Sequence, residues 1–273
     1  MMATDLRRVF DEFQASFDPD VAGVSLSWLA DALERVRRRM DDRAWRAACA
    51  LTREHPAIAS LLRDPFLASA RRRDGGIPFA APVIDHVLLP HWHRPYGDAH
   101  AVALHRQSTG TSLAAALRSA TGALTAAIMQ ATARGPSCVV HAIAAGPARE
   151  LQRVRAELAP LPLREWLRGR PSAPSADLIY SPGLPAFLPD RAAERVVATL
   201  VRMLRPGGQL LMANPTPAAT ERAFIEAVLG IHMVYRHTAD WPAVTASLDP
   251  SHRVILSTSS DERLTWLSVT RTS

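Results

Sequence analysis

The chain contains two linked stretches that decide its fold, Ala176-Asp-Leu-Ile-Tyr-Ser-Pro-Gly-Leu-Pro-Ala-Phe-Leu-Pro-Asp190 and Leu204-Arg-Pro-Gly-Gly-Gln-Leu-Leu-Met-Ala-Asn214. The short apolar run over 177–180 predicts a buried parallel strand. We expect Asp190 to cap a helix over 191–204. The pair Gly207-Gly208 permits the positive φ that turns the chain into a second strand over 209–213. The order strand, helix, glycine turn, strand is the back half of a nucleotide-type α/β sheet.

Segments on both sides of these stretches extend the same pattern. They predict an N-terminal helical region over residues 1 to about 70, an alanine-rich helix over 112–133, a strand over 138–142, a helix over 148–158, a helix over 219–230, and strands over 253–258 and 264–270. The last two strands are close enough for an antiparallel hairpin at a sheet end. We therefore predict an α/β fold with a mostly parallel sheet. Residues 1–110 form a helical N-terminal and substrate or lid region, and residues 111–273 form the α/β domain.

The composition sets limits on the kind of protein. With 273 residues and 48% hydrophobic content, the chain can build one sizeable core and a smaller appended domain. No run of 18 apolar residues is present, and the N-terminus lacks the apolar core of a signal peptide. The only cysteines are Cys49 and Cys138, which fits a reducing compartment. We expect a cytoplasmic protein that does not span a membrane.

The charge is positive, but it does not indicate nucleic-acid binding. The net charge is +6, and all 32 basic residues are arginine, which we interpret as a compositional bias. Acidic residues are interspersed along the whole chain, and no nucleic-acid motif accompanies the arginine runs Arg37-Arg38-Arg39 and Arg71-Arg72-Arg73. We interpret these runs as a solvated helix face and a loop.

Five motifs in the same order resemble those of a bacterial group of class I S-adenosylmethionine (SAM)-dependent methyltransferases that carry a helical N-terminal region. They are Asp64-Pro65-Phe66, Ala144-Ala-Gly-Pro-Ala-Arg-Glu150, Asp177-Leu-Ile-Tyr-Ser-Pro-Gly-Leu184, Leu204-Arg-Pro-Gly-Gly208 and Met233-Val-Tyr-Arg236. The resemblance implies a Rossmann-like methyltransferase sheet and methylation of small molecules, including fatty-acid carboxylates. It implies SAM as cofactor, held by Gly146, Pro147, Arg149, Glu150, Ser181, Gly183 and Leu184.

The physical chemistry of the first motif supports that implication. A turn after the first strand must let the amino-acid end of the cofactor pass against the backbone, so it needs a residue without a β-carbon. Gly146 meets this need. A helix that begins at Pro147 presents N–H groups to the cofactor carboxylate.

The chain departs from the family pattern at three places. At the first, the family's Gly-Tyr-Ala-Gly-Asp loop aligns with 76–80, where Gly76 is kept but the Tyr and Asp positions are Ile77 and Ala80, although Asp85 further along still matches. At the second, only 26 residues separate Glu150 from Asp177. Two strands and two helices there need roughly 45 to 60 residues.

This short segment also affects the ribose site, where an acidic residue normally follows the glycine turn by about 20 residues. Glu165 is the only acidic residue in that window. The third departure is that Ala145 replaces the family's Cys, and the preceding helix keeps Arg118 alone of a Val-Arg-x-Arg-Arg pattern. The losses fall on cofactor-contacting positions, while the fold-defining positions are kept.

Two functions remain open from these observations. In the first, the chain is a pseudoenzyme with an eroded SAM site, a non-catalytic or repurposed subunit that acts with a partner enzyme in small-molecule or secondary metabolism. In the second, it is an active SAM-dependent methyltransferase of a carboxylate, hydroxyl or amine. We expect a homodimer, or a heterodimer with an intact methyltransferase-type enzyme. The faces considered for that contact are the helix over 112–133 and the apolar positions Trp28, Leu29 and Leu33.

Five of the ten histidines lie close together in the sequence, at His86, His91, His93, His100 and His105. His91-Trp-His93 with Asp98 offers metal-ligand side chains, but the spacing matches no standard motif, and we expect no metal. We interpret most of these histidines as surface or packing residues. One could act as a general base, and the catalytic candidates are His93, Tyr96 and Asp98.

Overall fold

The computed structural model describes residues 2–73, 81–89, 98–145, 148, 175–218 and 221–272. Two compact units make up the chain. The helical unit comprises Met1–Ala115 and Ala219–His232, and the sheet unit comprises Ala116–Ala218 and Met233–Ser273. Each unit therefore contains more than one segment of the chain.

The helical unit is built from short helices whose starts are fixed by local side chains. Its elements are α1 (Met2–Ser16), η1 (Pro19–Val21), α2 (Ala22–Arg37), α3 (Asp42–Leu51), α4 (Pro56–Leu61), α5 (Pro65–Arg72), α6 (Ala81–Leu88) and α7 (Ala99–Ser108). Asp41 caps α3 by accepting a hydrogen bond from Ala44 N at 2.7 Å. His55 and Asp64 cap α4 and α5 in the same way, each just before a proline at the first helical position.

Large apolar side chains form most of the core of the helical unit. It includes Leu6, Phe10, Phe13, Leu29, Leu33, Trp45, Ile58 and Leu61, each at most 1% exposed. Leu29 and Leu33 were considered above as a face for another chain. Both side chains are 0% exposed, whereas Trp28, the third position considered, is half-buried, and a contact with another chain stays a prediction.

A late segment of the chain belongs to the helical unit. It consists of α11 (Arg222–Phe224), which continues as a π-helix, η4 (Ile225–Leu229), and ends at Gly230 in the left-handed conformation. All five residues of η4 are buried. The predicted helix over 219–230 is therefore present in part, but over 225–229 its backbone is a π-helix.

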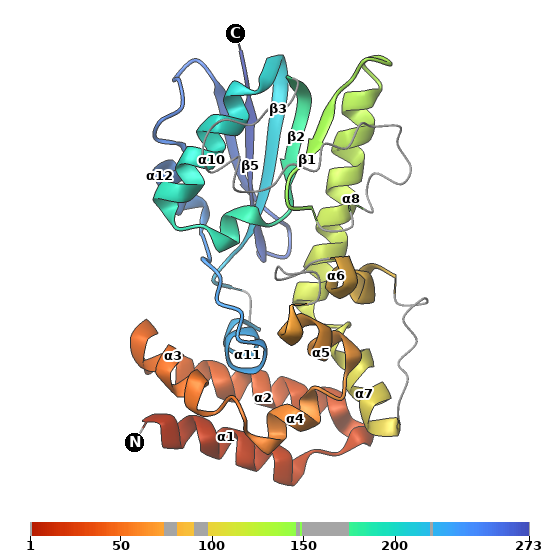
Figure 1. Cartoon of the computed structure of the whole chain (residues 1–273), viewed down its shortest axis with the longest axis vertical. Coiled ribbons are helices and arrows are strands. Elements are labelled where there is room, and N and C mark those ends of the chain that lie inside the picture. The colour runs from red at the N-terminus through yellow and green to blue at the C-terminus, as the bar shows by residue number, and fades with distance from the viewer. Residues whose placement is uncertain are drawn as a thin grey trace. The chain divides into compact units, whose positions relative to one another are not determined.

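The sheet unit contains five strands in the order β1-β2-β3-β5-β4 (Figure 1). The strands are β1 (Val140–Ala142), β2 (Ala176–Ser181), β3 (Leu204–Pro215), β4 (Arg253–Thr258) and β5 (Leu264–Thr270). β1, β2 and β3 are parallel, β5 is antiparallel to β3, and β4 is antiparallel to β5. The predicted strands and the terminal hairpin are confirmed, although β3 is longer than its predicted range.

Helices cover both faces of this sheet (Figure 1). α8 (Ser112–Thr132) packs its Leu124 and Ile128 against Leu178 and Tyr180 of β2. On the other face, buried residues of α10 (Asp190–Arg202) and α12 (Pro242–Thr245) pack in one core with Ile179. Successive side chains of β2 are thus buried on opposite faces of the sheet, and for this reason the strand is a continuous apolar run in the sequence.

The structure differs from the sequence expectation at the start of α10. Asp190 is the first helical residue, and Pro189 occupies the N-cap position. The Asp190 carboxylate is engaged by Arg236, with an Arg236 Nη2 to Asp190 Oδ1 distance of 2.8 Å. The predicted helix over 148–158 is described only at Ala148, which has left-handed backbone and is not helical. The rest of that helix and the shortened segment before β2 lie outside the described residues, so both stay predictions.

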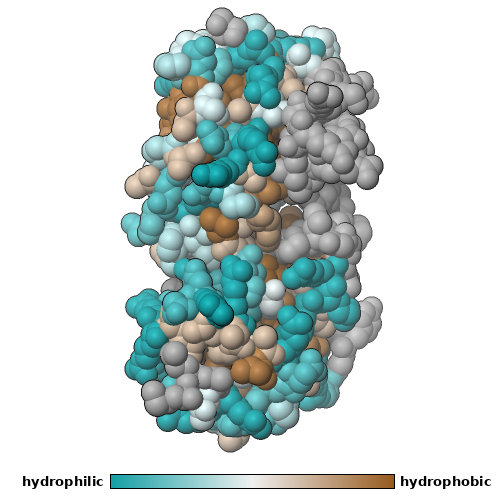
Figure 2. All heavy atoms as spheres, turned by 60° about the vertical axis from the view of Figure 1, so that its left-hand side comes forward, coloured by the Kyte–Doolittle hydropathy of each residue, from teal (hydrophilic) through white to brown (hydrophobic). Residues whose placement is uncertain are grey.

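None of the described helices is long and apolar enough to cross a membrane. On the face seen in Figure 2, hydrophilic residues are spread over the described surface and hydrophobic residues lie between them.

Candidate functional site

The carboxyl ends of β1, β2 and β3 form the edge where open α/β sheets bind ligands. After β1, Ala144 and Ala148 both have left-handed backbone, with φ of 49° and 46°. For residues that carry a β-carbon, this conformation costs about 1–3 kcal/mol each. The chain therefore turns sharply where the resemblance implies a cofactor. Gly146, Pro147, Arg149 and Glu150 themselves lie outside the described residues.

After β2, the implied cofactor residues are folded into the protein. Ser181 is 0% exposed, and its Oγ accepts a hydrogen bond from Leu184 N at 3.3 Å. Leu184 is 3% exposed and begins a short 3-10 helix, η3 (Leu184–Phe187). Gly183 has extended backbone, and none of the described residues lies within 4 Å of the position a Cβ would take. Ser181 and Leu184 therefore serve the packing of this loop.

Arg236 holds the same loop from inside. Its side chain is 1% exposed, and Nη1 donates to Pro185 O at 2.6 Å while Nη2 donates to Leu188 O at 2.8 Å. The guanidinium also contacts Asp190, and Nη1 donates to Asn214 Oδ1 at 3.2 Å. We call Arg236, Asp190, Asn214 and the two carbonyl groups the arginine clamp. It joins the loop after β2 to the end of β3.

Further hydrogen bonds close the arginine clamp on its second side. Asn214 Nδ2 donates to Val234 O at 2.9 Å, and Val234 N donates to Ala186 O at 2.7 Å. A shallow cleft of about 410 Å³ lies beside the clamp and is lined by Asp190, Tyr235 and Asp240 among others. The Asp240 carboxylate accepts a hydrogen bond from His237 N at 2.6 Å. The charged groups of the cleft are thus largely committed to the protein itself.

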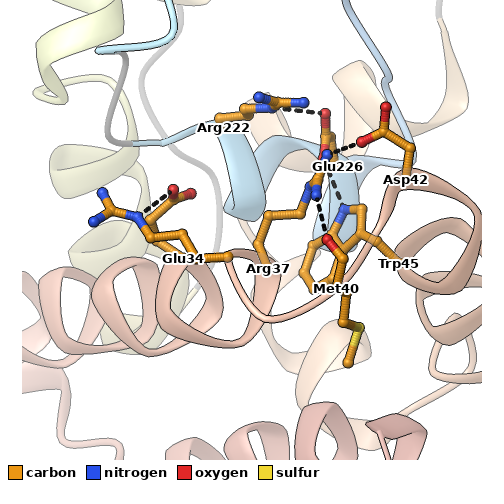
Figure 3. A network of polar contacts seen from close by, with 8 residues as sticks. Glu34, Arg37, Met40, Asp42, Trp45, Arg222 and Glu226 are labelled. Atoms are coloured by element: carbon orange, nitrogen blue, oxygen red, sulfur yellow. Dashed lines mark hydrogen bonds and ion pairs between the residues drawn. The ribbon is translucent and has the colours of Figure 1, made fainter.

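A second polar cluster lies in the helical unit around Glu226 (Figure 3). Glu226 is 3% exposed, and its Oε2 accepts from Trp45 Nε1 at 2.7 Å and from Arg37 Nε at 3.3 Å. Its Oε1 accepts from Arg222 Nε at 3.3 Å. Arg37 also donates to Met40 O and pairs with Asp42. The buried carboxylate accepts three hydrogen bonds, and those from Arg37 and Trp45 hold η4 against α2 and α3.

The environment of this cluster also affects two titratable side chains. Desolvation by burial lowers the pKa of His232, and the arginines around it, Arg46, Arg37 and Arg222, act in the same direction, while Glu226 opposes them. Burial, with a smaller contribution from Glu226, raises the pKa of the Cys49 thiol to about 12. Neither group is therefore charged at neutral pH.

Of the three catalytic candidates, the structure describes Asp98 alone. His93 and Tyr96 lie outside the described residues. Asp98 caps α7 by accepting from Ala101 N at 3.1 Å, and it pairs with Arg63. Those contacts give Asp98 a structural role.

The described histidines of the cluster pack within the helical unit. His105 Nδ1 contacts Asp64 Oδ1 at 2.7 Å, and Asp64 also accepts from Ser108 Oγ and from Phe66 N. His100 Nε2 lies 3.0 Å from Ser60 Oγ, and its pKa is lowered by burial first and by Arg63 second. In the part of the chain that the structure describes, no three His, Cys, Asp or Glu side chains come together as metal ligands.

Sequence reasoning missed both the arginine clamp and the Glu226 cluster. The Tyr-Arg signature at 235–236 marked Arg236 as a family feature but gave no role for it. No sequence signal pointed to Glu226, because its partners Arg37 and Trp45 lie 189 and 181 residues away in the chain. By contrast, the Asp-Pro-Phe motif did mark the position of Asp64.

In the described part of this edge, polar side chains bond within the protein. Ser181, Asn214 and Arg236 direct their polar groups at one another or at the loop after β2. A bound cofactor needs such groups for its own polar atoms. The fit of the turn after β1 depends on residues beyond those described.

Comparison with known proteins gives similarity at the level of the fold. No family model matches the chain, and no curated protein sequence matches it. A solved protein from Bordetella parapertussis, described as a possible exported protein, superimposes with a TM-score of 0.59 at 17% identity. The match covers 85% of this chain and 94% of that one.

Two methyltransferases of known structure match more distantly. The CurJ carbon methyltransferase matches with a TM-score of 0.49 at 13% identity, over 100% of this chain and 92% of its own. Magnesium protoporphyrin IX methyltransferase (ChlM) from Synechocystis PCC 6803 matches with a TM-score of 0.41 at 12% identity, over 70% of this chain and 98% of its own.

The fold class follows from the sheet itself. Three parallel strands are followed by an antiparallel pair at the sheet end, helices lie on both faces, and a helical region precedes them. The chain therefore has a Rossmann-like α/β sheet preceded by a helical N-terminal region, as the sequence predicted.

Proposed function

We propose that this chain is a methyltransferase-like protein whose SAM site is eroded, and that it acts as a non-catalytic subunit beside a partner enzyme of small-molecule metabolism. The single observation that carries the proposal is the state of the loop after β2. Ser181 is fully buried and bonded to Leu184, and Arg236 uses its donors on Pro185 and Leu188. A loop that satisfies its own polar groups has little to offer a ligand.

The sequence supports the same proposal from another part of the site. The segment between Glu150 and Asp177 has 26 residues, and the ribose-binding window holds one acidic residue, Glu165. A charge-assisted hydrogen bond to a cofactor hydroxyl is worth about 1.5–3 kcal/mol. Loss of two such bonds lowers the affinity by more than about a hundredfold.

A second candidate function is an active SAM-dependent methyltransferase of a carboxylate, hydroxyl or amine. The left-handed backbone at Ala144 and Ala148 favours it, because strained turns persist where a ligand needs close approach. The retained sequence Gly146-Pro147 between them is suited to a cofactor carboxylate.

Methyl transfer assays distinguish the two functions. Transfer from labelled SAM to small-molecule acceptors is measured with this chain alone, with each methyltransferase-type enzyme encoded beside it, and with the two together. We expect no turnover from the chain alone and a higher rate or yield from one partner when the chain is added. Turnover by the chain alone contradicts the proposal and establishes the second candidate.

A further inference from the structure

The outermost strand of the described sheet, β4, presents an open edge. It pairs with β5 over six consecutive residues, from Arg253 opposite Thr270 to Thr258 opposite Thr265, without any irregularity. Within the described ranges, no backbone hydrogen bond joins the other side of β4 to another segment. Every residue of β4 except Leu256 is exposed.

The register shows which backbone groups point outward. Ser259 N donates to Leu264 O at 2.8 Å, so the residues two, four and six before Ser259 also face β5. Val254, Leu256 and Thr258 therefore direct their N–H and C=O groups away from the sheet. The Thr258 hydroxyl and the Thr238 hydroxyl form a hydrogen bond of 2.9 Å, which does not involve the backbone N–H or C=O of Thr258.

This edge lacks the features that normally keep sheet edges apart. Natural edges are protected by proline, bulges or charges along the strand. β4 has the sequence Arg-Val-Ile-Leu-Ser-Thr, with one charge at its first residue. Val254 and Ile255 are 38% and 43% exposed, so β-branched apolar side chains flank the open backbone.

The charges around β4 identify the occupant. Arg253 is exposed at its start, and the turn after its end holds the exposed Asp261 and Glu262 together with the half-buried Arg263. Asp249, further before the start, accepts a hydrogen bond from Ser251 N at 2.8 Å. Two carboxylates and one guanidinium leave the turn net negative, so the exposed arginine of one copy meets a negative turn of the other when two copies run antiparallel.

A two-fold axis at Leu256 satisfies the backbone as well as the charges. When two copies of the same strand pair antiparallel, each residue must oppose one whose number differs from its own by an even number. Otherwise the side chains of opposing residues lie on different faces of the sheet. With Leu256 opposite Leu256 of the second copy, Val254 faces Thr258 and Ile255 faces Ser257. Each outward N–H of Val254, Leu256 and Thr258 then meets an outward C=O of the second copy.

We propose that the outer edge of β4 pairs antiparallel with β4 of a second copy of this chain, which joins two five-stranded sheets into one continuous sheet. Arg253 of each copy lies near Glu262 of the other. The contact uses the sheet unit alone, so it holds whether or not the chain binds SAM and whether or not a partner enzyme exists.

Sedimentation velocity on the full chain over a range of concentrations tests the proposal. We expect a wild-type dimer. Arg253→Glu brings like charges together twice in each dimer, so it raises the dissociation constant by about tenfold or more. Glu262→Arg in the Arg253→Glu background restores the dimer. Val254→Pro removes an outward N–H without touching a β5 hydrogen bond, and it also weakens the dimer.

Arg195→Glu is the matched control, because it makes the same charge change at an exposed position of α10. It leaves the dimer unchanged, and circular dichroism verifies that each variant is folded. A monomeric wild type overturns the proposal, as does a dimer that both Arg253→Glu and Val254→Pro leave intact. A double variant that stays dissociated overturns the antiparallel arrangement.

Discussion

Replacement of Arg236 by methionine removes the arginine clamp while keeping an unbranched apolar side chain in its place. The Arg236 side chain is 1% exposed and donates to the carbonyl groups of Pro185 and Leu188 at 2.6 and 2.8 Å. Arg236→Met leaves both acceptors without this donor, at about 1–3 kcal/mol each. Asp190 is 56% exposed and can be solvated, so its loss of a partner adds little. We expect the free energy of unfolding to fall by about 2–6 kcal/mol, with the two carbonyl groups left without donors as the main cause.

Urea unfolding followed by tryptophan fluorescence measures this change, and Trp241, which is 0% exposed, reports on the sheet unit. With a slope of about 2 kcal/mol per molar urea, the midpoint falls by roughly 2 M. Arg191→Met, at an exposed position of α10, is the control and changes stability by less than about 0.5 kcal/mol. Hydrogen exchange locates the effect, since peptides from η3 lose protection first. An Arg236→Met protein as stable as the control would refute the clamp.

Three further predictions concern the Glu226 cluster, His232 and the thiol of Cys49. Glu226→Gln keeps the size of the side chain but removes the charge that Arg37 faces, so it lowers the free energy of unfolding by about 2–4 kcal/mol. Trp45→Phe removes one N–H and lowers it by about 1–2 kcal/mol. Equal losses of unfolding free energy in the two variants, measured by chemical unfolding, would contradict the network. The pKa of His232 is lowered in the folded protein, so the unfolded state binds a proton first and stability falls as the pH drops below about 6.5. His232→Asn reduces the slope of unfolding free energy against pH in that range. An unchanged slope would exclude His232 as the cause. Burial raises the pKa of Cys49 to about 12, so we expect a thiol reagent at pH 7.5 to modify Cys49 slowly in the folded protein. Peptide mapping separates Cys49 from the half-buried Cys138, and rapid labelling at Cys49 itself would show that its thiol is accessible.

The sequence predicted the elements that depend on local pattern. The strands at 253–258 and 264–270 have the predicted bounds, because β-branched runs with a short intervening turn leave few alternatives. The helical N-terminal region was predicted from apolar residues at helical spacing, and the structure has helices from Met2 to Arg72 in that region. Such features involve residues within a few positions of one another.

The sequence could not predict contacts between distant segments. Arg236 reaches Pro185 and Leu188 across 51 and 48 residues, and only the fold brings them together. The π-helix at 225–229 has the spacing of an ordinary helix in the sequence, and its tie to the helical unit depends on Glu226 reaching α2 and α3. Ser181 carried a family motif, yet its burial and its bond to Leu184 were visible only in three dimensions.

Calorimetric titration of SAM into the purified chain measures directly whether the cofactor site is eroded. We expect a dissociation constant of about 100 μM or weaker, because two missing polar contacts at about 1.5 kcal/mol each lower the affinity more than a hundredfold. The same titration with S-adenosylhomocysteine is expected to be equally weak. Low-micromolar binding of SAM would contradict the eroded site and would establish this chain as a cofactor-binding methyltransferase.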